Sequence, residues 1–181
     1  MALGLKVKDR EAGAHNLRVA RLCVQIGRQL SMSAAELRLL ARAGLLHDVG
    51  KLRIPETLLG KHDALDEAEW RLIRTHPEIG HSLLDHAGRS SREVLAVLYH
   101  HERLDGSGYP YGLKAEAIPI EARIVAVADT YDALTSDRPY RMACTQAEAR
   151  RVLGEESGLR LDARAVGALV SALDQGFALA S

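Results

Sequence analysis

Two pairs of adjacent residues in this sequence, His47-Asp48 and His100-His101, could bind metal ions. Imidazole and carboxylate are ligands for hard or borderline divalent metals, and adjacent ligands at a helix end can reach one ion or two neighbouring ions. In isolation, a His-Asp pair is more often a surface histidine beside a solvated aspartate. Adjacent histidines can equally cap a helix, where they meet its C-terminal dipole. The pairs therefore indicate a metal site only if further ligands join them.

Further positions could complete such a site. Glu11 and His15 are four residues apart, so a helix places their side chains on one face, although many surface helices carry such a pair by chance. Asp129 follows the apolar segment 124–128, where a carboxylate needs a cation or a hydrogen-bond partner. His76 is undistinguished in isolation. Each position is weak alone, and together they favour a metal-binding constellation.

The segment from His100 to Pro110 reads His-His-Glu-Arg-Leu-Asp-Gly-Ser-Gly-Tyr-Pro. It is similar to the defining signature of the HD-GYP family, His-His-Glu-x-x-Asp-Gly-x-Gly-Tyr-Pro. Only residues 142–181 lack specific matches to the family. The other matching segments are Glu11-x-x-x-His15-x-x-Arg18, Leu46-His47-Asp48-Val49-Gly50-Lys51, Ile54-Pro55, His76-x-x-x-Gly80, Gly112-Leu113, Ile118-Pro119, Arg123-Ile124, and Ala128-Asp129 through Arg141.

The resemblance implies a centre of two or three divalent metal ions. Glu11 and His15 resemble the extra ligands of family members that hold a third ion. The family uses non-haem iron or manganese, and the nitrogen and oxygen ligands present here suit either metal. The implied ligands of the two-metal centre are His47, Asp48, His76, His100, His101 and Asp129.

Substrate-binding roles also follow from the resemblance, which implies cyclic di-GMP as the substrate. Lys51 is expected to meet the scissile phosphate, and Tyr109 to contact a guanosine portion. Arg138 and Arg141 are expected to bind the remaining charge of the substrate. Asp132 resembles a supporting residue that orients Lys51.

The implied reaction is hydrolysis of cyclic di-GMP to pGpG, which only some family members cut further to GMP, in bacterial second-messenger signalling. Two metals acidify a bridging water to hydroxide and neutralise charge on the phosphate oxygens. Asp48 and Lys51 would be the catalytic side chains, with Lys51 stabilising the charge that remains. Glu11 favours a third metal and therefore GMP as the final product.

Two other functions are compatible with parts of the pattern. A non-hydrolytic module would sense cyclic di-GMP or dock onto a diguanylate cyclase. A phosphohydrolase for another cyclic dinucleotide or nucleotide would need only the His47-Asp48 pair. The complete ligand set argues against the first alternative, and the intact Gly-Tyr-Pro loop at 108–110 argues against the second.

The site requires helices that bring these distant residues together. Strong helix formers dominate the sequence and only 4% of residues are aromatic, which predicts an all-α fold. Helix starts are indicated at Ser33, Asp66, Ser90 and Thr145, each followed three residues later by glutamate. The long loop at 105–117 is rich in Gly and is expected to be functional. The predicted helices are 9–29, 34–46, 66–75, 77–87, 91–101, 119–135, 146–156 and 163–174.

The remaining unusual residues are expected to be structural. Cys23 and Cys144 are too few for a disulfide framework and are expected to be reduced core thiols. Trp70 and Phe177 are expected to anchor the core. Ala115 stands where the family often has glycine, whose backbone angles alanine reaches at a cost. The histidines that match nothing are expected on the surface: His62, His81 and His86.

Composition fits one domain, residues 1–181, with 1–8 as an N-terminal extension and 145–181 as C-terminal helices. The 24 basic and 24 acidic residues cancel, so neither a nucleic acid polymer nor a membrane is expected as a partner. No apolar run approaches the roughly 20 residues of a membrane helix. We expect a cytoplasmic helical bundle of the HD phosphohydrolase type. A homodimer and control by an upstream sensor or receiver domain remain open.

Overall fold

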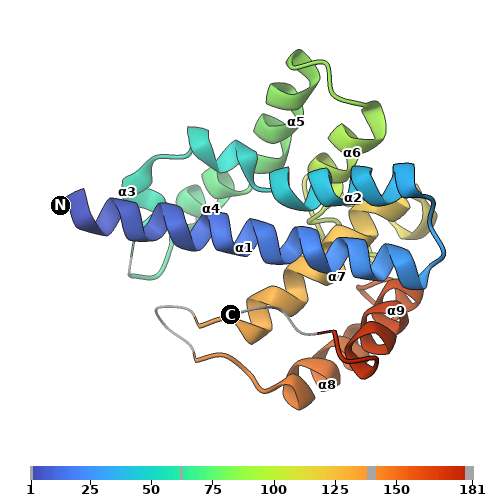
Figure 1. Ribbon diagram of the computed structural model, residues 1–181. Coiled ribbons are helices and arrows are strands. Elements are labelled where there is room, and N and C mark those ends of the chain that lie inside the picture. Colours follow the sequence, from blue (N-terminus) through green and yellow to red (C-terminus); the bar gives the residue numbers. More distant parts are fainter. Residues whose placement is uncertain (1, 62, 138–141, 178–181) are drawn as a thin grey trace.

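The computed structural model describes residues 2–61, 63–137 and 142–177, without the side chains of residues 2–12. The described residues form helices and contain no β-strand, so the all-α prediction is confirmed. The helices, shown in Figure 1, are α1 (Ala2–Gln29), α2 (Ala34–Leu46), α3 (Glu56–Leu59), α4 (Glu67–Ile73), α5 (His76–His86), α6 (Ser91–Tyr99), α7 (Ile120–Thr135), α8 (Gln146–Glu156) and α9 (Ala163–Asp174), with short 3-10 helices η1 (Val49–Arg53) and η2 (Ala115–Ala117).

Predicted and observed helices agree at the segments with the clearest start signals. Helices α2, α8 and α9 have the predicted bounds. Ser33, Asp66 and Thr145 each form a reciprocal capping box with the glutamate three residues later. Ser90 caps α6 by accepting a hydrogen bond from the backbone N–H of Glu93. The sequence did not predict η1 and α3, and α1 already begins at Ala2, within the proposed extension.

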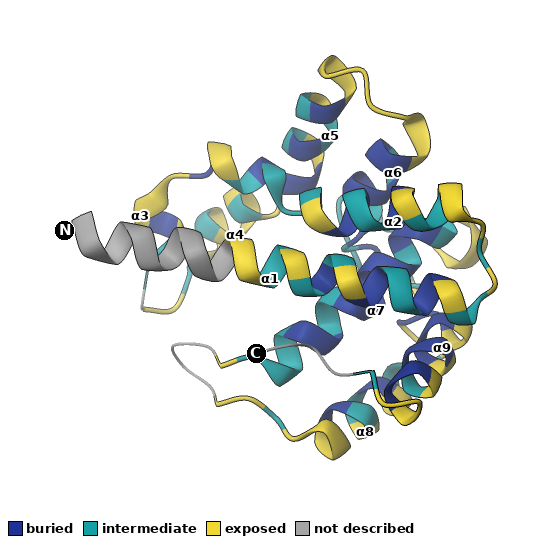
Figure 2. Ribbon diagram, viewed as in Figure 1, coloured by how far each residue is buried: buried dark blue, intermediate teal, exposed yellow. Residues whose placement is uncertain are grey.

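Helices α1 and α7 form the centre of the fold. Helix α1 runs across the molecule and packs against α2, α7 and α9 (Figure 1). Burial gathers on α7 and on the inward face of α1, as Figure 2 shows. The segment 124–128 of α7 is buried, together with Val19, Leu22 and Ile26 of α1. Burying these apolar side chains stabilises the layer that carries His15 and Asp129.

The structural expectations have mixed outcomes. Cys23 is fully buried and Phe177 packs against the core, as predicted, whereas Cys144 is only partly buried. Trp70 was predicted to be a core anchor, and this is wrong, because its side chain is 47% exposed on α4. That helix is short and has no buried residue, so it offers no core face.

Of the histidines that match no family position, the two that the structure describes are not fully buried. His86 is exposed, and its Nδ1 lies 2.7 Å from the carbonyl oxygen of Ser82. His81 is partly buried, and His62 lies outside the described residues. Within the described part of the chain, no helix combines the length and the hydropathy of a bilayer-spanning segment.

A close backbone contact sets the distance between η1 and α5. A Cβ atom on Gly50 would lie 1.9 Å from the carbonyl oxygen of His76 and 2.7 Å from the backbone nitrogen of Gly80. Only glycine permits this approach, since backbone atoms cannot move aside as a flexible side chain would. The contact brings Asp48, two residues before Gly50, next to His76.

Candidate metal centre

Four potential metal ligands from three different helix ends converge in a first group, which we call the histidine cluster. One ligand atom from each of its four residues lies within 4.8 Å of all the others. One comes from the turn after α2, one from the start of α5, and two from the end of α6. The members of the histidine cluster are Asp48, His76, His100 and His101.

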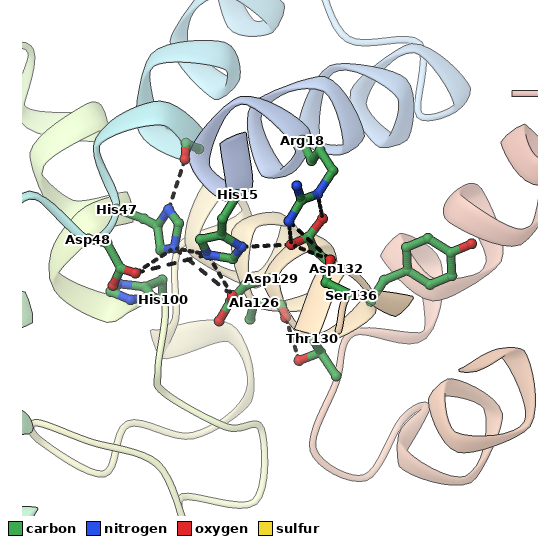
Figure 3. Close-up of polar contacts among 12 residues, drawn as sticks. His15, Arg18, His47, Asp48, His100, Ala126, Asp129, Thr130, Asp132 and Ser136 are labelled. Carbon is green, nitrogen blue, oxygen red and sulfur yellow. Dashed lines mark hydrogen bonds and ion pairs between the residues drawn. The ribbon is translucent and has the colours of Figure 1, made fainter. Parts of the chain in front are cut away.

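A second group, which we call the mixed cluster, consists of His15, His47 and Asp129, whose ligand atoms also lie within 4.8 Å of one another. His15 comes from α1, His47 is the C-cap of α2, and Asp129 comes from α7. His15 Nε2 is 3.5 Å from Asp129 Oδ1 and 3.3 Å from His47 Nε2. Figure 3 shows these side chains pointing toward one another.

The two clusters adjoin at Asp48. Its Oδ2 lies 3.5 Å from His47 Nε2 in the mixed cluster, and its Oδ1 lies 3.4 Å from His76 Nε2 in the histidine cluster. One carboxylate therefore faces both groups, and the sequence pair His47-Asp48 contributes one member to each cluster. This arrangement can hold two neighbouring ions that share a carboxylate ligand.

Backbone carbonyl groups fix the orientation of three imidazoles. The Nδ1 atoms of His47, His76 and His100 lie 2.8, 2.8 and 2.6 Å from the carbonyl oxygen three residues earlier in the chain. A carbonyl oxygen only accepts, so Nδ1 is the donor in each case. In the neutral ring, Nε2 then carries the free lone pair and points into the cluster. Partners of this kind orient metal-ligating histidines in proteins.

The protonation states also favour a cation. Burial lowers the pKa of His76, His100 and His101 below the usual value of an imidazole, so these rings are neutral at physiological pH. Burial opposes ionisation of Asp48, but nearby basic groups, His47 and Lys51 first, hold its pKa well below the usual range. The cluster therefore presents lone pairs and a negative charge together.

A buried, unsatisfied atom tests whether a metal fits. Asp48 Oδ1 is buried and has no hydrogen-bond partner among the described residues. His76 Nε2 lies 3.4 Å from this oxygen and 3.4 Å from His100 Nε2, and both nitrogens carry lone pairs rather than protons. A buried carboxylate oxygen without a donor is costly, and a cation bound among these atoms removes that cost. The side chains therefore fit a divalent metal ion in the histidine cluster.

Asp132 supports the mixed cluster and not Lys51, contrary to the sequence interpretation. Its buried carboxylate accepts from Arg18 Nε at 2.6 Å and lies 2.7 Å from His15 Nδ1. The pairing with His15 leaves His15 Nε2 free to face His47 (Figure 3). Lys51 instead donates to Asp48 Oδ2 at 2.6 Å, and its side chain is 38% exposed. It therefore lies at the open edge of the metal centre.

The signature loop is attached to the centre through two residues. Glu102 is buried, and its carboxylate accepts hydrogen bonds from the backbone N–H groups of Tyr111 and Leu113 at 2.8 and 3.0 Å. The Tyr109 ring stacks on the ring of His101 with centroids 4.7 Å apart. The loop thus holds Tyr109 directly against a member of the histidine cluster.

Gly108 and Ala115 have backbone positions in this loop that restrict which residue fits. A Cβ atom on Gly108 would lie 2.4 Å from the Cα atom of Glu102, which leaves no room for a side chain. Ala115 has a φ of 45°, in the left-handed region, so alanine adopts here a conformation that glycine reaches without cost. The left-handed backbone expected where the family often has glycine is therefore present at Ala115.

The structure brings together seven of the eight predicted metal ligands. The side chain of Glu11, and all of Arg138 and Arg141, lie outside the described residues, so their roles stay predictions. Sequence reasoning missed the roles of Arg18 and Glu102. Both were visible within matched motifs, but only their hydrogen bonds identify them as supporting residues.

In this chain, helices from distant parts of the sequence bring together His and Asp side chains that could bind metal ions. This arrangement is typical of metal-binding helical proteins. Residues 5–165 match the family described as HD domain. The chain belongs to this family, and its relatives and signature loop place it in the HD-GYP branch.

Several known proteins resemble the chain. It is 42% identical over 174 residues to the "Cyclic di-GMP phosphodiesterase response regulator RpfG" of Xanthomonas campestris, covering 94% of this chain and 46% of that protein. It is 35% identical to the "3'3'-cGAMP-specific phosphodiesterase 2" of Vibrio cholerae, covering 99% and 35%.

Among solved structures, the HDG"Y"P protein Bd1817 of Bdellovibrio bacteriovorus has a TM-score of 0.74 at 22% identity, covering 90% of this chain and 52% of that one. This likeness shows the fold. The chain spans less than half the length of the two curated relatives above.

Proposed function

We propose that this chain hydrolyses the phosphodiester bonds of cyclic di-GMP in bacterial second-messenger signalling. The observation that carries the proposal is Asp48, whose carboxylate faces two adjoining ligand clusters beside the Tyr109 loop. Two adjoining metals suit in-line displacement at a phosphodiester. Relatives at 42% and 43% identity are named cyclic di-GMP phosphodiesterases.

The residues of the chain would divide the work as follows. Divalent ions held by the two clusters would supply Lewis acidity to the phosphodiester and to the attacking water. The fixed rings of His47, His76 and His100 hold their Nε2 lone pairs toward the centre without rearrangement. Lys51, partly exposed at the edge, would bind the phosphate and stabilise its charge. Tyr109 would contact a guanosine portion.

We further propose iron or manganese as the metal, because imidazole and carboxylate ligands suit both. The histidine cluster and the mixed cluster would each hold one ion. A third ion would need Glu11 near His15, and this third site would favour GMP over pGpG as the final product. Arg138 and Arg141 would bind the second phosphate of the substrate.

Cyclic GMP-AMP is the second candidate substrate. Relatives at 35% and 37% identity are named 3'3'-cGAMP-specific phosphodiesterases, and the chain aligns to one of them over 99% of its length. Both candidate substrates share the cyclic phosphodiester ring and one guanine. The candidate metal ligands would face the shared part, so discrimination would come from side chains that contact the bases.

The test is anaerobic purification, metal analysis, and mass spectrometry of products from cyclic di-GMP and cyclic GMP-AMP. We expect metal-dependent conversion of cyclic di-GMP to pGpG or GMP. Replacing His47 and Asp48 by Ala should abolish metal binding and hydrolysis together. The matched control replaces the exposed Asp85-His86 pair of α5 by Ala and should change neither. Turnover by the first variant, or binding without turnover by the metal-loaded protein, would refute the proposal.

A further inference from the structure

Trp70 is the one tryptophan of the chain, and its side chain lies on the protein surface. Its side chain is 47% exposed on α4, six residues before the cluster member His76. The exposed ring offers a flat apolar face on which a planar partner can stack. The neighbours of Trp70 indicate what that partner is.

A row of cation–π and ring contacts connects Trp70 to the histidine cluster. The Arg74 guanidinium carbon lies 5.7 Å from the centroid of the Trp70 ring and 5.4 Å from that of Tyr109. Tyr109 in turn stacks on His101, with an angle of 26° between the rings. The row His101, Tyr109, Arg74 and Trp70 therefore leads from the proposed metal centre to an exposed aromatic surface.

Arg74 is exposed, and among the described residues its guanidinium group contacts aromatic rings rather than carboxylates. A guanidinium held against two rings keeps its N–H groups at the edge of the plane, where they can donate to a ligand. Guanine offers two adjacent acceptors, O6 and N7, that match this fork, whereas adenine replaces O6 with a donor. The charge and geometry of Arg74 thus suit guanine.

We propose that Trp70 and Arg74 form a purine-binding subsite, in which a guanine base of the substrate stacks on Trp70 and accepts hydrogen bonds from Arg74. This inference rests on the proposed function, since the metal centre would place the phosphodiester ring next to the row. The subsite takes the base that lies farther from the metals. It makes Trp70 and Arg74 specificity-determining residues.

Trp70 itself reports on the subsite, because its fluorescence is the only tryptophan signal of the chain. Metal-free protein, which cannot turn over, is titrated with GMP and with ribose 5-phosphate, which lacks the base. We expect saturable quenching by GMP and none by ribose 5-phosphate. Equal responses to both compounds, or no response to either, would overturn the subsite.

Kinetics provide the second test. Base–aromatic stacking removed by alanine substitution predicts that Trp70→Ala raises KM for cyclic di-GMP by about 5- to 150-fold, with kcat and metal content retained. Trp70→Phe should restore most of the affinity. Leu72→Ala is the matched control, since Leu72 is exposed on the same helix. An unchanged KM in Trp70→Ala would contradict the proposal.

Arg74→Lys separates charge from geometry, because lysine keeps the charge and loses the planar fork. We expect this variant to lose preference for GMP over AMP in the fluorescence titration, and an unchanged preference would refute the role of Arg74. If the wild-type protein hydrolyses no cyclic dinucleotide, the proposed function fails, while the titration with GMP still decides the subsite.

Discussion

Asp132→Asn tests whether the carboxylate of Asp132 supports the metal centre. In the folded protein, this buried group pairs with Arg18 at 2.6 and 2.9 Å and with His15 Nδ1 at 2.7 Å. Burial opposes its ionisation, but hydrogen bonds from His15 and Arg18 outweigh burial and lower its pKa. The substitution removes the negative charge and places an amide N–H₂ group opposite one of the two donors.

The expected losses follow from these contacts. Removing one partner of a fully buried ion pair costs about 3–5 kcal/mol, and because the Arg18 side chain is 26% exposed we expect about 2 kcal/mol of unfolding free energy. His15 also loses the group that orients it. Loss of such a partner typically weakens metal affinity about 10- to 100-fold.

The assay combines chemical denaturation of the metal-free protein with metal titration of both forms. Asp162→Asn is the matched control, since Asp162 is also buried, accepts from Arg123 at 2.6 Å and caps α9, but belongs to neither cluster. The control should lose comparable unfolding free energy and keep its metal affinity.

The sign of the pH effect gives a further check on Asp132. A lowered carboxyl pKa contributes stability that is fully present above the unfolded value of about 3.9 and is lost as the pH falls below that value and through the lower pKa of the folded protein. The difference between wild-type and Asp132→Asn should therefore shrink in acid. Equal loss of metal affinity in Asp132→Asn and Asp162→Asn would refute the supporting role, because it would trace the effect to general stability.

Three other outcomes are expected. Glu102→Ala should raise KM several-fold with metal content retained, since the loop loses two hydrogen bonds to a charged group, and an unchanged KM would contradict this. Gly50→Ala should cost more than about 2 kcal/mol in denaturation and reduce metal binding, because its Cβ meets backbone atoms; wild-type stability would disprove the contact. Burial lowers the pKa of His76, His100 and His101, so unfolding takes up protons once the pH falls below their unfolded value of about 6.5. The metal-free protein should therefore lose at most about 4 kcal/mol of unfolding free energy per pH unit below that value. Equal denaturation midpoints at neutral and mildly acidic pH would contradict this.

Much of the fold is readable from local signals. Capping boxes at Ser33, Asp66 and Thr145 mark helix starts because the side chain and the backbone groups they join are only three residues apart. The short helix η1 escaped prediction, since it packs against a distant segment through the contact of Gly50 with His76, and α3 has only 4 residues, too few to show an apolar period.

Local signals did not predict the environment of Trp70. Its size and hydrophobicity predicted a core position, but α4 has no buried residue, and the ring instead makes a cation–π contact with Arg74. Asp132 is a similar case, because motif resemblance alone linked it to Lys51, whereas the packing of α1 against α7 brings it to Arg18 and His15.

The sequence by itself determined the helical class, the family and, Glu11 apart, which candidate ligands would gather at one place, because these depend on residue types and on short spacings. Tertiary structure alone decided how the ligands divide: His47 joins His15 and Asp129, while its neighbour Asp48 joins the three other histidines and faces both groups. Adjacent residues at a helix end point in different directions, and which partners they meet depends on the packing of helices far apart in the chain.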